Sequence, residues 1–169
     1  ASHPDKKIEW WYYTGNVDTA EGRWFGYQLT FFRVGVDPKP ENPSRWAVRD
    51  LHMAHFAVSD LGRTRFRFFD RLQRAGSGWA GASTDRLHVW NGRWSVEAQP
   101  DGSQRVRASQ DDVSLELVLG TTAEWRGGVR GDRRFVAHGE AGYSQKGTQP
   151  GNASHYYSMT RLDTRGTIT

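Results

Sequence analysis

Several polar side chains stand among aromatic residues in this sequence, and some of them are of types that transfer protons. Glu9 begins a run of four aromatics, and His55 lies within the apolar run that ends at Val58. Burial raises the pKa of a carboxyl group, which lets it keep a proton at neutral pH and act as a general acid. We therefore expect Glu9 to supply a proton in any reaction, with His55 as the alternative.

Other members of this group are of types that orient a ligand. Buried polar groups are costly unless they are paired, so they either hydrogen-bond with one another or face a ligand. Trp11 and Tyr157 would stack on a cationic intermediate, and Gln28 or Arg33 would orient the ligand. The expected ligand-binding residues are Trp11, Tyr13, Gln28, Arg33, His138, Tyr143 and Tyr157.

The residues needed for disulfides, metal sites and nucleophilic hydrolysis are absent or unsuitably placed in this sequence. The chain contains no cysteine, which excludes disulfides, thiolate metal sites and a cysteine nucleophile. The histidines are dispersed, and His52 and His55 would face opposite sides of a strand, so we expect no metal and no cofactor. The Gly-x-Ser-x-Gly nucleophile elbow of many hydrolases and the phosphate-binding P-loop pattern are also absent.

The charge distribution argues against nucleic acid as a partner. The net charge is +4 and the isoelectric point is about 9.6, but the arginines are scattered. In Arg65-Phe66-Arg67-Phe68 they alternate with aromatics, as on a strand with one solvated face. No segment reaches the roughly 18 apolar residues of a membrane span. We expect neither nucleic-acid binding nor a membrane-spanning segment.

The elements that would position these residues are strands. Glu9-Trp10-Trp11-Tyr12-Tyr13 would place large rings on both faces of one strand, because side chains alternate with period two. Glu9, Trp11 and Tyr13 would share one face, and Trp10, Tyr12 and Thr14 the other. Such a strand is typical of a wall between a pocket and a core, although the rings could also simply pack on each other.

Turn signals join the strands into hairpins. A turn at residues 17–22 separates the first two aromatic runs, and Asn91-Gly92 is a strong short hairpin signal because both residues tolerate positive φ. Further turns are expected at 100–103 and 110–112. Residues 64–70 are interpreted as a strand or the start of a short helix, residues 46–59 as a strand, and 126–134 as a loop. The last residues, 166–169, would begin another strand.

This pattern predicts an all-β, antiparallel fold in one domain over residues 1–169. Sequential hairpins with one apolar face favour a β-barrel or a strongly curved sheet of about 8 to 10 strands, with a sandwich as the alternative. A barrel of this size has room for a ligand.

Five segments together resemble the lipocalin-like carotenoid 1,2-hydratase family, whose bacterial members are often labelled predicted secreted hydrolases. The segments are 3–16, 25–33, 54–60, 138–147 and 152–162, which include Glu9-Trp10-Trp11-Tyr12-Tyr13, His138-Gly139, and His155-Tyr156-Tyr157-Ser158. The resemblance implies lipocalin-like β-domains in tandem, of which this chain resembles the first. The Trp-x-Asp-His/Arg-x-Trp type of motif in the second half of the family is absent here, so its hydratase residues are not carried over.

The resemblance implies an extracytoplasmic protein that binds an apolar small molecule, such as an isoprenoid, a polyene or a lipid, in an aromatic pocket. Acid-assisted hydration or rearrangement of that ligand is one expectation. The alternatives are a non-catalytic lipid- or pigment-binding module and a secreted hydrolase. A terminal strand without its partner would leave an open sheet edge, so we expect pairing with a second domain, a second chain or another copy.

Overall fold

The computed structural model describes residues 1–37, 41–44, 46–120 and 135–169, and these contain strands and no helix. In chain order the strands are β1 (Ile8–Asp18), β2 (Trp24–Gly35), β3 (Asp50–Asp60), β4 (Arg65–Arg74), β5 (Ala80–Ala82), β6 (His88–Asn91), β7 (Trp94–Ala98), β8 (Gln104–Gln110), β9 (Val113–Leu119), β10 (Phe135–Ala137), β11 (Tyr143–Gln145), β12 (Ala153–His155), β13 (Tyr157–Met159) and β14 (Thr164–Ile168). They fall into two compact units: unit 1 is Ala1–Leu119 with Thr164–Thr169, and unit 2 is Gly120–Asp163.

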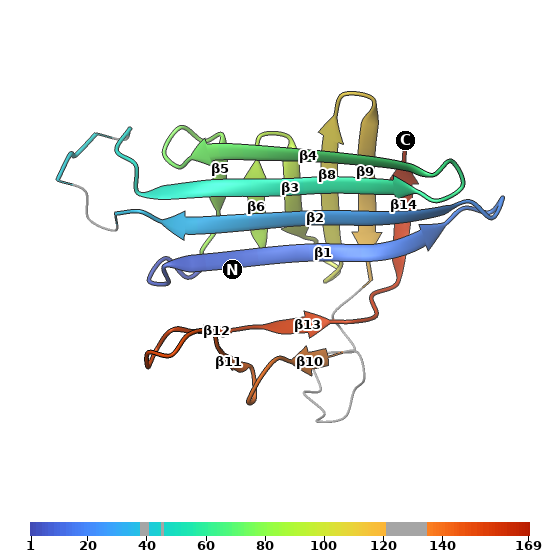
Figure 1. Cartoon of the computed structure of the whole chain (residues 1–169). Coiled ribbons are helices and arrows are strands. Elements are labelled where there is room, and N and C mark those ends of the chain that lie inside the picture. Colours follow the sequence, from blue (N-terminus) through green and yellow to red (C-terminus); the bar gives the residue numbers. More distant parts are fainter. Residues whose placement is uncertain (38–40, 45, 121–134) are drawn as a thin grey trace. The chain divides into compact units, whose positions relative to one another are not determined.

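The first sheet of unit 1 is a four-stranded antiparallel meander in the order β1-β2-β3-β4 (Figure 1). The expected turn after β1 is present: the Gly22 amide donates to the Thr19 carbonyl, and Gly22 has φ +78°. The resulting register places Trp11 opposite Phe31 and Tyr13 opposite Leu29. Both predicted faces of β1 are therefore confirmed by its pairing with β2.

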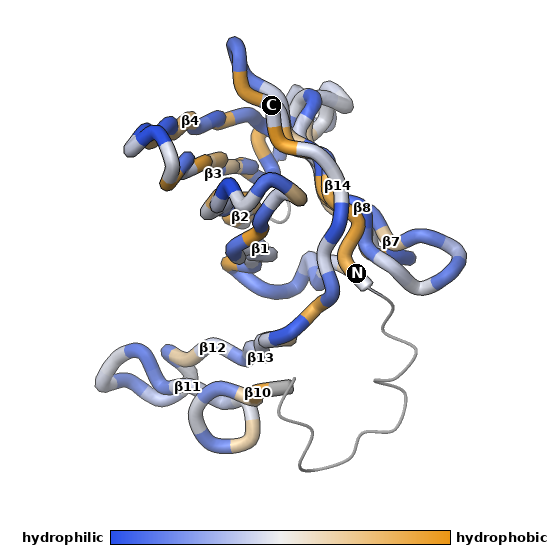
Figure 2. The backbone as a smooth tube through the Cα atoms, turned by 90° about the vertical axis from the view of Figure 1, so that its right-hand side faces the viewer, coloured by the Kyte–Doolittle hydropathy of each residue, from blue (hydrophilic) through white to orange (hydrophobic). Residues whose placement is uncertain are grey.

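The second sheet of unit 1 has six strands in the order β14-β9-β8-β7-β6-β5. The predicted Asn91-Gly92 hairpin joins β6 to β7, and Gly92 has φ +61°. The chain returns at Thr164 to add β14 beside β9, so the strand expected at the end of the sequence is confirmed. Figure 2 shows the two sheets from the side as separate layers, and their strands cross steeply in Figure 1.

The core of unit 1 lies between these two sheets. Leu29, Phe31 and Phe56 of the four-stranded sheet are fully buried, as are Trp94 and Val96 of the six-stranded sheet. The rings of Phe56 and Trp94 meet edge to face, with centroids 5.6 Å apart. Each such side chain stabilises the fold by roughly 1.5–3 kcal/mol through burial. The interior between the sheets is thus packed with side chains of the protein itself.

The all-β, antiparallel prediction is confirmed, and no sheet of the described residues closes into a barrel. The open sheets fit the strongly curved form of a lipocalin-like fold. Residues 65–74 form a strand rather than a short helix, and the strand expected over 46–59 begins at Asp50. The loop expected at 126–134 lies outside the described residues. A single domain over 1–169 stays a prediction.

Unit 2 consists of two short antiparallel pairs, β10 with β13 and β11 with β12. Ala137 lies opposite Tyr157, and Tyr143 lies opposite His155. Gly139 and Gly142 both have positive φ, and a Cβ on Gly139 would overlap the Tyr143 carbonyl group. Glycine at position 139 is therefore required by the close approach of two backbone segments.

Candidate functional site

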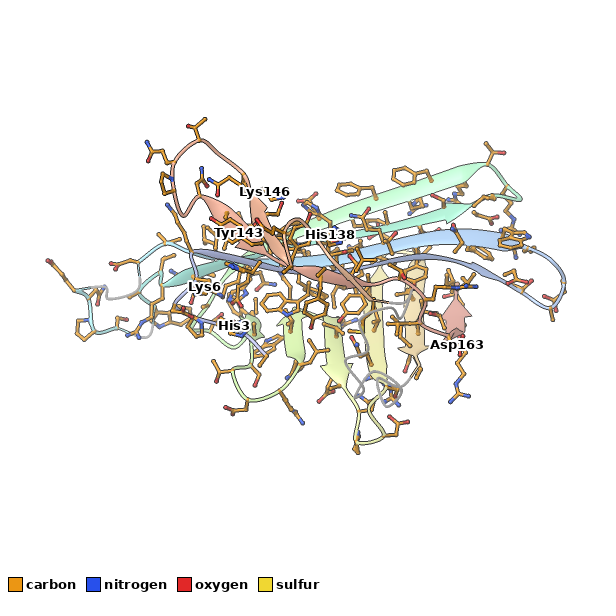
Figure 3. All side chains as sticks on the ribbon, turned by 90° about the horizontal axis from the view of Figure 1, so that it is seen from below. His3, Lys6, His138, Tyr143, Lys146 and Asp163 are labelled. Atoms are coloured by element: carbon orange, nitrogen blue, oxygen red, sulfur yellow. The ribbon has the colours of Figure 1, made fainter. Side chains whose placement is uncertain are left out.

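A buried ionic cluster joins the N-terminal segment to the start of β1. The Arg33 Nε donates to Glu9 Oε2 at 2.8 Å, and its Nη1 donates to Asp50 Oδ1 at 2.8 Å. Its Nη2 donates to the carbonyls of His3 and Lys6, at 3.0 and 2.5 Å. Figure 3 shows His3 and Lys6 near each other on this segment. Arg33 therefore fixes the first residues of the chain against the edge of the sheet.

Several hydrogen-bond donors surround the Glu9 carboxylate. Besides Arg33, its carboxylate accepts from the Ser2 hydroxyl at 2.6 Å and from the His3 amide at 2.7 Å. The His3 ring nitrogen Nδ1 lies 2.9 Å from Oε1. The Glu9 side chain is 10% exposed, and that of Arg33 is 4% exposed. All of these partners favour the ionised carboxylate.

The electrostatic balance follows from those contacts. Desolvation alone would raise the pKa of Glu9, but the hydrogen bonds from Ser2, Arg33 and His3 outweigh it and lower the pKa. Desolvation would likewise lower the pKa of Arg33, yet its carboxylate partners Glu9 and Asp50 raise that pKa. At neutral pH this geometry is that of an ion pair that locks the N-terminal segment. The role of Glu9 as a general acid stays a prediction, and it would require the carboxyl group to be protonated.

Trp11 and Tyr13 lie on the same face of β1 as Glu9, toward the six-stranded sheet. The Tyr13 hydroxyl donates to Gln104 Oε1 at 2.7 Å, which ties β1 to β8. Gln104 itself is buried. The side chains of Trp11 and Tyr13 are both partly buried, and their role in ligand binding stays a prediction.

Gln28 and His55 lie on the opposite face of the same sheet, which we call the outer face. The register pairs Thr30 with His55 and Gln28 with Ala57, while the core residues Leu29 and Phe56 point the other way. The His55 ring contacts Phe32 at 5.3 Å and Phe68 at 5.7 Å between centroids. His52, by contrast, is buried on the inner face, as expected from its spacing. The sheet thus separates His55 and Gln28 from Glu9, Trp11, Tyr13 and Arg33.

A groove of about 470 Å³ lies on this outer face. It is lined by Thr14, Gly15, Asn16, Gly26, Tyr27, Gln28, Ala57, Ser59 and Phe66. The small residues at its floor create the space: a Cβ on Gly26 would lie 3.6 Å from Asn16 Oδ1 and 3.6 Å from Ser59 Cβ. Gln28 exposes its amide at the groove, with one hydrogen bond to Thr30 Oγ1 at 3.3 Å.

Aromatic side chains continue from the groove across the outer face. Phe66 is 65% exposed, and Phe68, two residues along β4, is 52% exposed. Trp24 on β2 and Tyr12 on β1 are also exposed. Asn16, Gly26, Ser59 and Phe66 are not among the ligand-binding residues expected from the sequence. The missing signal was cross-strand pairing, which alone brings Asn16, Gly26, Ser59 and Phe66 into one row.

The remaining expected residues lie in unit 2. His138 stacks on Tyr156 with ring centroids 4.3 Å apart and planes 7° from parallel, and its Nε2 lies 2.6 Å from Ser158 Oγ. Tyr143 is partly exposed and donates its hydroxyl proton to Gln145 Oε1 at 2.9 Å. Tyr157 is half exposed on β13. Figure 3 shows His138 and Tyr143 with Lys146, whose Nζ lies 4.9 Å from the centroid of the Tyr156 ring.

Two absences hold for the described part of the chain. It contains no group of three or more histidines and acidic residues placed to hold a metal ion. It also contains no helix long and apolar enough to cross a membrane.

The comparisons with known proteins place this architecture in a family. No curated protein matches the chain. The crystal structure of a protein from Nitrosomonas europaea assigned as AttH matches with a TM-score of 0.78 and 34% sequence identity. The match covers 99% of this chain and 47% of that protein, so the chain spans about half the length of this relative. The AttH-like family profile matches residues 1–169, and the chain therefore belongs to the AttH-like family.

Proposed function

We propose that the chain binds an isoprenoid, a polyene or another lipid with one polar end on the outer face of its four-stranded sheet. The observation that carries this proposal is the groove around Gly26, which continues into exposed aromatic side chains. Ligand sites combine mostly apolar walls with a few polar groups that fix orientation. Between the sheets, by contrast, core side chains such as Phe56 and Trp94 are buried and pack on each other.

The groove would hold the polar end of the ligand. Thr14, Asn16, Gln28 and Ser59 offer hydroxyl and amide groups at its walls. Such neutral groups both donate and accept hydrogen bonds, which suits a ligand hydroxyl or carbonyl oxygen. Among the residues that the structure describes, no charged side chain lines the groove. An uncharged polar end is therefore favoured over an ammonium or a phosphate at this place.

The apolar part of the ligand would lie along the sheet beyond the groove. Phe68 follows Phe66 on β4, and the row that pairs Trp10, Phe32, Met53 and Leu72 lies further along the same face. Leu72 is 61% exposed although its neighbours across the sheet are apolar. An extended hydrocarbon chain over this face would remove these groups from water, at about 25 cal/mol for each Å² covered.

If the site is catalytic, His55 would be its proton donor. It lies on the same face, two residues along β3 from Ala57 of the groove, a separation of about 7 Å. Phe32 and Phe68 contact its ring and would bring it next to the hydrocarbon chain. Acid-assisted hydration or rearrangement, as in the carotenoid 1,2-hydratase family that the sequence resembles, would use His55 as the proton donor. The runner-up is a binding module without chemistry, and an extracytoplasmic location belongs to the same proposal.

Pairing through a sheet edge also belongs to this proposal. In unit 1 the edge strands are β1 and β4 of one sheet and β14 and β5 of the other. Exposed edge strands are templates for a further strand. The relative from Nitrosomonas europaea is about twice as long as the matched region, so a second domain is the favoured partner.

The test is to incubate the chain with a mixed lipid, isoprenoid and carotenoid extract and to identify retained molecules by native mass spectrometry. Gly26→Val fills the groove between Asn16 and Ser59, and we expect it to abolish retention. Ser95→Val makes a similar change on the outer side of the six-stranded sheet and should leave retention intact. Retention that is equal in wild type and Gly26→Val would refute the outer-face site.

A second comparison separates catalysis from binding. If the site is catalytic, His55→Gln should abolish turnover of a retained polyene while sparing its binding. Glu9→Gln would do the same only if the carboxyl on the inner face were the acid. Retention without turnover in the wild type would favour the binding module.

A further inference from the structure

Arg71 reaches from the four-stranded sheet to the six-stranded sheet. It lies on the inner side of β4, opposite Ala54 of β3. Its Nη2 donates to Gln110 Oε1 at 2.7 Å, and its Nη1 makes a long contact of 3.4 Å with the Asn91 carbonyl. Its guanidinium also lies over the ring of Trp94, 4.4 Å from the centroid. Three different contacts thus hold this cation in one place.

This guanidinium differs from the other inward-facing arginines in having no acidic partner. Arg33 pairs with two carboxylates and Arg67 pairs with Asp112, whereas no carboxylate contacts Arg71 in the described part of the chain. The Gln110 side chain links Arg71 to a carboxylate only indirectly: its Oε1 accepts from Arg71, and its Nε2 donates to Asp111 Oδ1 at 3.0 Å. Desolvation, together with the charge of Arg93, lowers the pKa of Arg71. The positive charge is therefore partly desolvated, and neutral groups rather than a carboxylate contact it.

Further donors surround the same turn between β6 and β7. A Cβ on Gly92 would overlap Arg71 Nη1 and would lie 3.6 Å from Gln73 Nε2, so both side chains approach this glycine. Arg93 follows directly in the chain, is exposed, and makes no hydrogen bond or ion pair with a described residue. Of the five N–H donors of Arg71, only two have partners among these residues.

We propose that Arg71, Gln73 and Arg93 form a binding site for an oxyanion, such as the phosphate or carboxylate group of a ligand, at the Gly92 turn. Guanidinium groups bind such oxygens in pairs, and charge-assisted hydrogen bonds are about twice as strong as neutral ones. The amide of Gln73 adds a neutral donor. Gly92 carries no side chain, which lets the Arg71 guanidinium and the Gln73 amide approach this turn together. This site lies apart from the outer-face groove and does not depend on the proposed lipid function.

Binding at this place would also stabilise unit 1. Arg71 contacts the ends of β6 and β8, so an anion on its guanidinium would strengthen a link between the two sheets. It would also remove the repulsion between Arg71 and Arg93. A ligand that binds only the folded chain raises its stability with concentration, and the effect follows the occupancy of the site.

The experiment measures thermal unfolding of the whole chain with inorganic phosphate or with acetate, each against chloride at equal ionic strength. We expect a rise in Tm that saturates with phosphate, with acetate or with both, and the arms tell which oxyanion chemistry the site takes. Arg93→Gln should weaken the apparent Kd about tenfold, since it removes one charge-assisted donor. The Nε–Hε signal of Arg71 in a ¹⁵N spectrum should shift along the same titration.

Suitable controls separate this site from general salt effects. Arg86→Gln removes an exposed arginine that pairs with Glu97 and should keep the wild-type response. If Arg71→Gln does not fold, Gln73→Ala and Arg93→Gln carry the test, because neither side chain has a hydrogen-bond partner among the described residues. The proposal is overturned if neither anion raises Tm, if the rise never saturates, or if Arg93→Gln responds like the wild type.

Discussion

Replacing Arg33 by methionine tests whether the N-terminal cluster is a structural lock. The change keeps a long apolar side chain but removes four hydrogen bonds, to Glu9, Asp50 and the carbonyls of His3 and Lys6. It leaves the Glu9 carboxylate, 10% exposed, without its cation. Breaking a buried ion pair on one side typically costs 3–5 kcal/mol.

The expected magnitude lies at the lower end of that range. Asp50 is 28% exposed, so water can partly replace the arginine there, and the destabilisation should be about 3 kcal/mol. For a domain of this size that corresponds to a fall in Tm of roughly 10 °C. Thermal and urea unfolding of both proteins measure it. Arg23→Met is the matched control, because the Arg23–Asp60 pair is 44% exposed on its arginine side and should cost less than about 1 kcal/mol.

A double-mutant cycle with Glu9→Gln identifies the source of the effect. If the two groups act as a pair, the combined variant should be about 1–2 kcal/mol more stable than the sum of the single changes predicts. Additive effects would refute the pairing. The pH dependence gives a second check: the pKa of Glu9 is lowered in the fold, so its stabilisation is present above the ordinary value of 4.5 and is lost as the pH falls further. Arg33→Met should flatten this acid limb.

Three further outcomes follow from the structure. His52 is buried, and desolvation lowers its pKa, so the stability of the fold should fall as the pH drops below 6.5. His52→Leu should remove this loss of stability, measured as urea midpoints over a pH series. If the pH dependence of the urea midpoint is unchanged in the variant, His52 is not its cause. Gly92→Ala should destabilise the fold by about 1–3 kcal/mol, because the residue has a positive φ and a Cβ would displace Arg71. The cost should exceed that of Gly22→Ala, where φ is also positive but a Cβ meets open space. Equal losses of stability in the two variants would leave backbone strain as the sole cause. Trp94→Ala should cost about 3–5 kcal/mol in chemical unfolding, because this side chain is fully buried, and Trp94→Phe should cost less; a near-neutral Trp94→Ala would contradict the two-sheet core.

Local patterns in the sequence predict many of the strands of unit 1 and the two faces of β1. The alternation in Glu9–Thr14 separates the two sides of β1 correctly, and His52 and His55 lie on opposite faces as their odd spacing requires. The expected turn between β6 and β7 is present, with Gly92 and Arg93 between the paired residues Asn91 and Trp94, and Gly92 takes the positive φ that the turn requires. These features depend on neighbours within a few residues, which is why they are readable without the structure.

The partners of Glu9 could not be predicted in the same way. Arg33 is 24 residues away along the chain, and its pairing with Glu9 depends on the register set by the turn after β1. Ser2 and His3 reach the carboxylate only because the chain folds back before the strand begins. Without these contacts, burial alone predicts a raised pKa and a general acid. With them, the hydrogen bonds outweigh burial and lower the pKa of Glu9, which favours the ionised carboxylate.

The groove around Gly26 shows the same dependence on register from the other side of the sheet. Asn16, Gly26, Ser59 and Phe66 occupy one row across four strands, and glycine and serine in the middle of that row lower the surface between larger neighbours. A slip of one residue between β2 and β3 would turn Ser59 inward and place the core residue Val58 in the row. Burial of Phe56 and Val58 on the inner face opposes that slip. The core packing of one face therefore fixes the register that forms the groove on the other face.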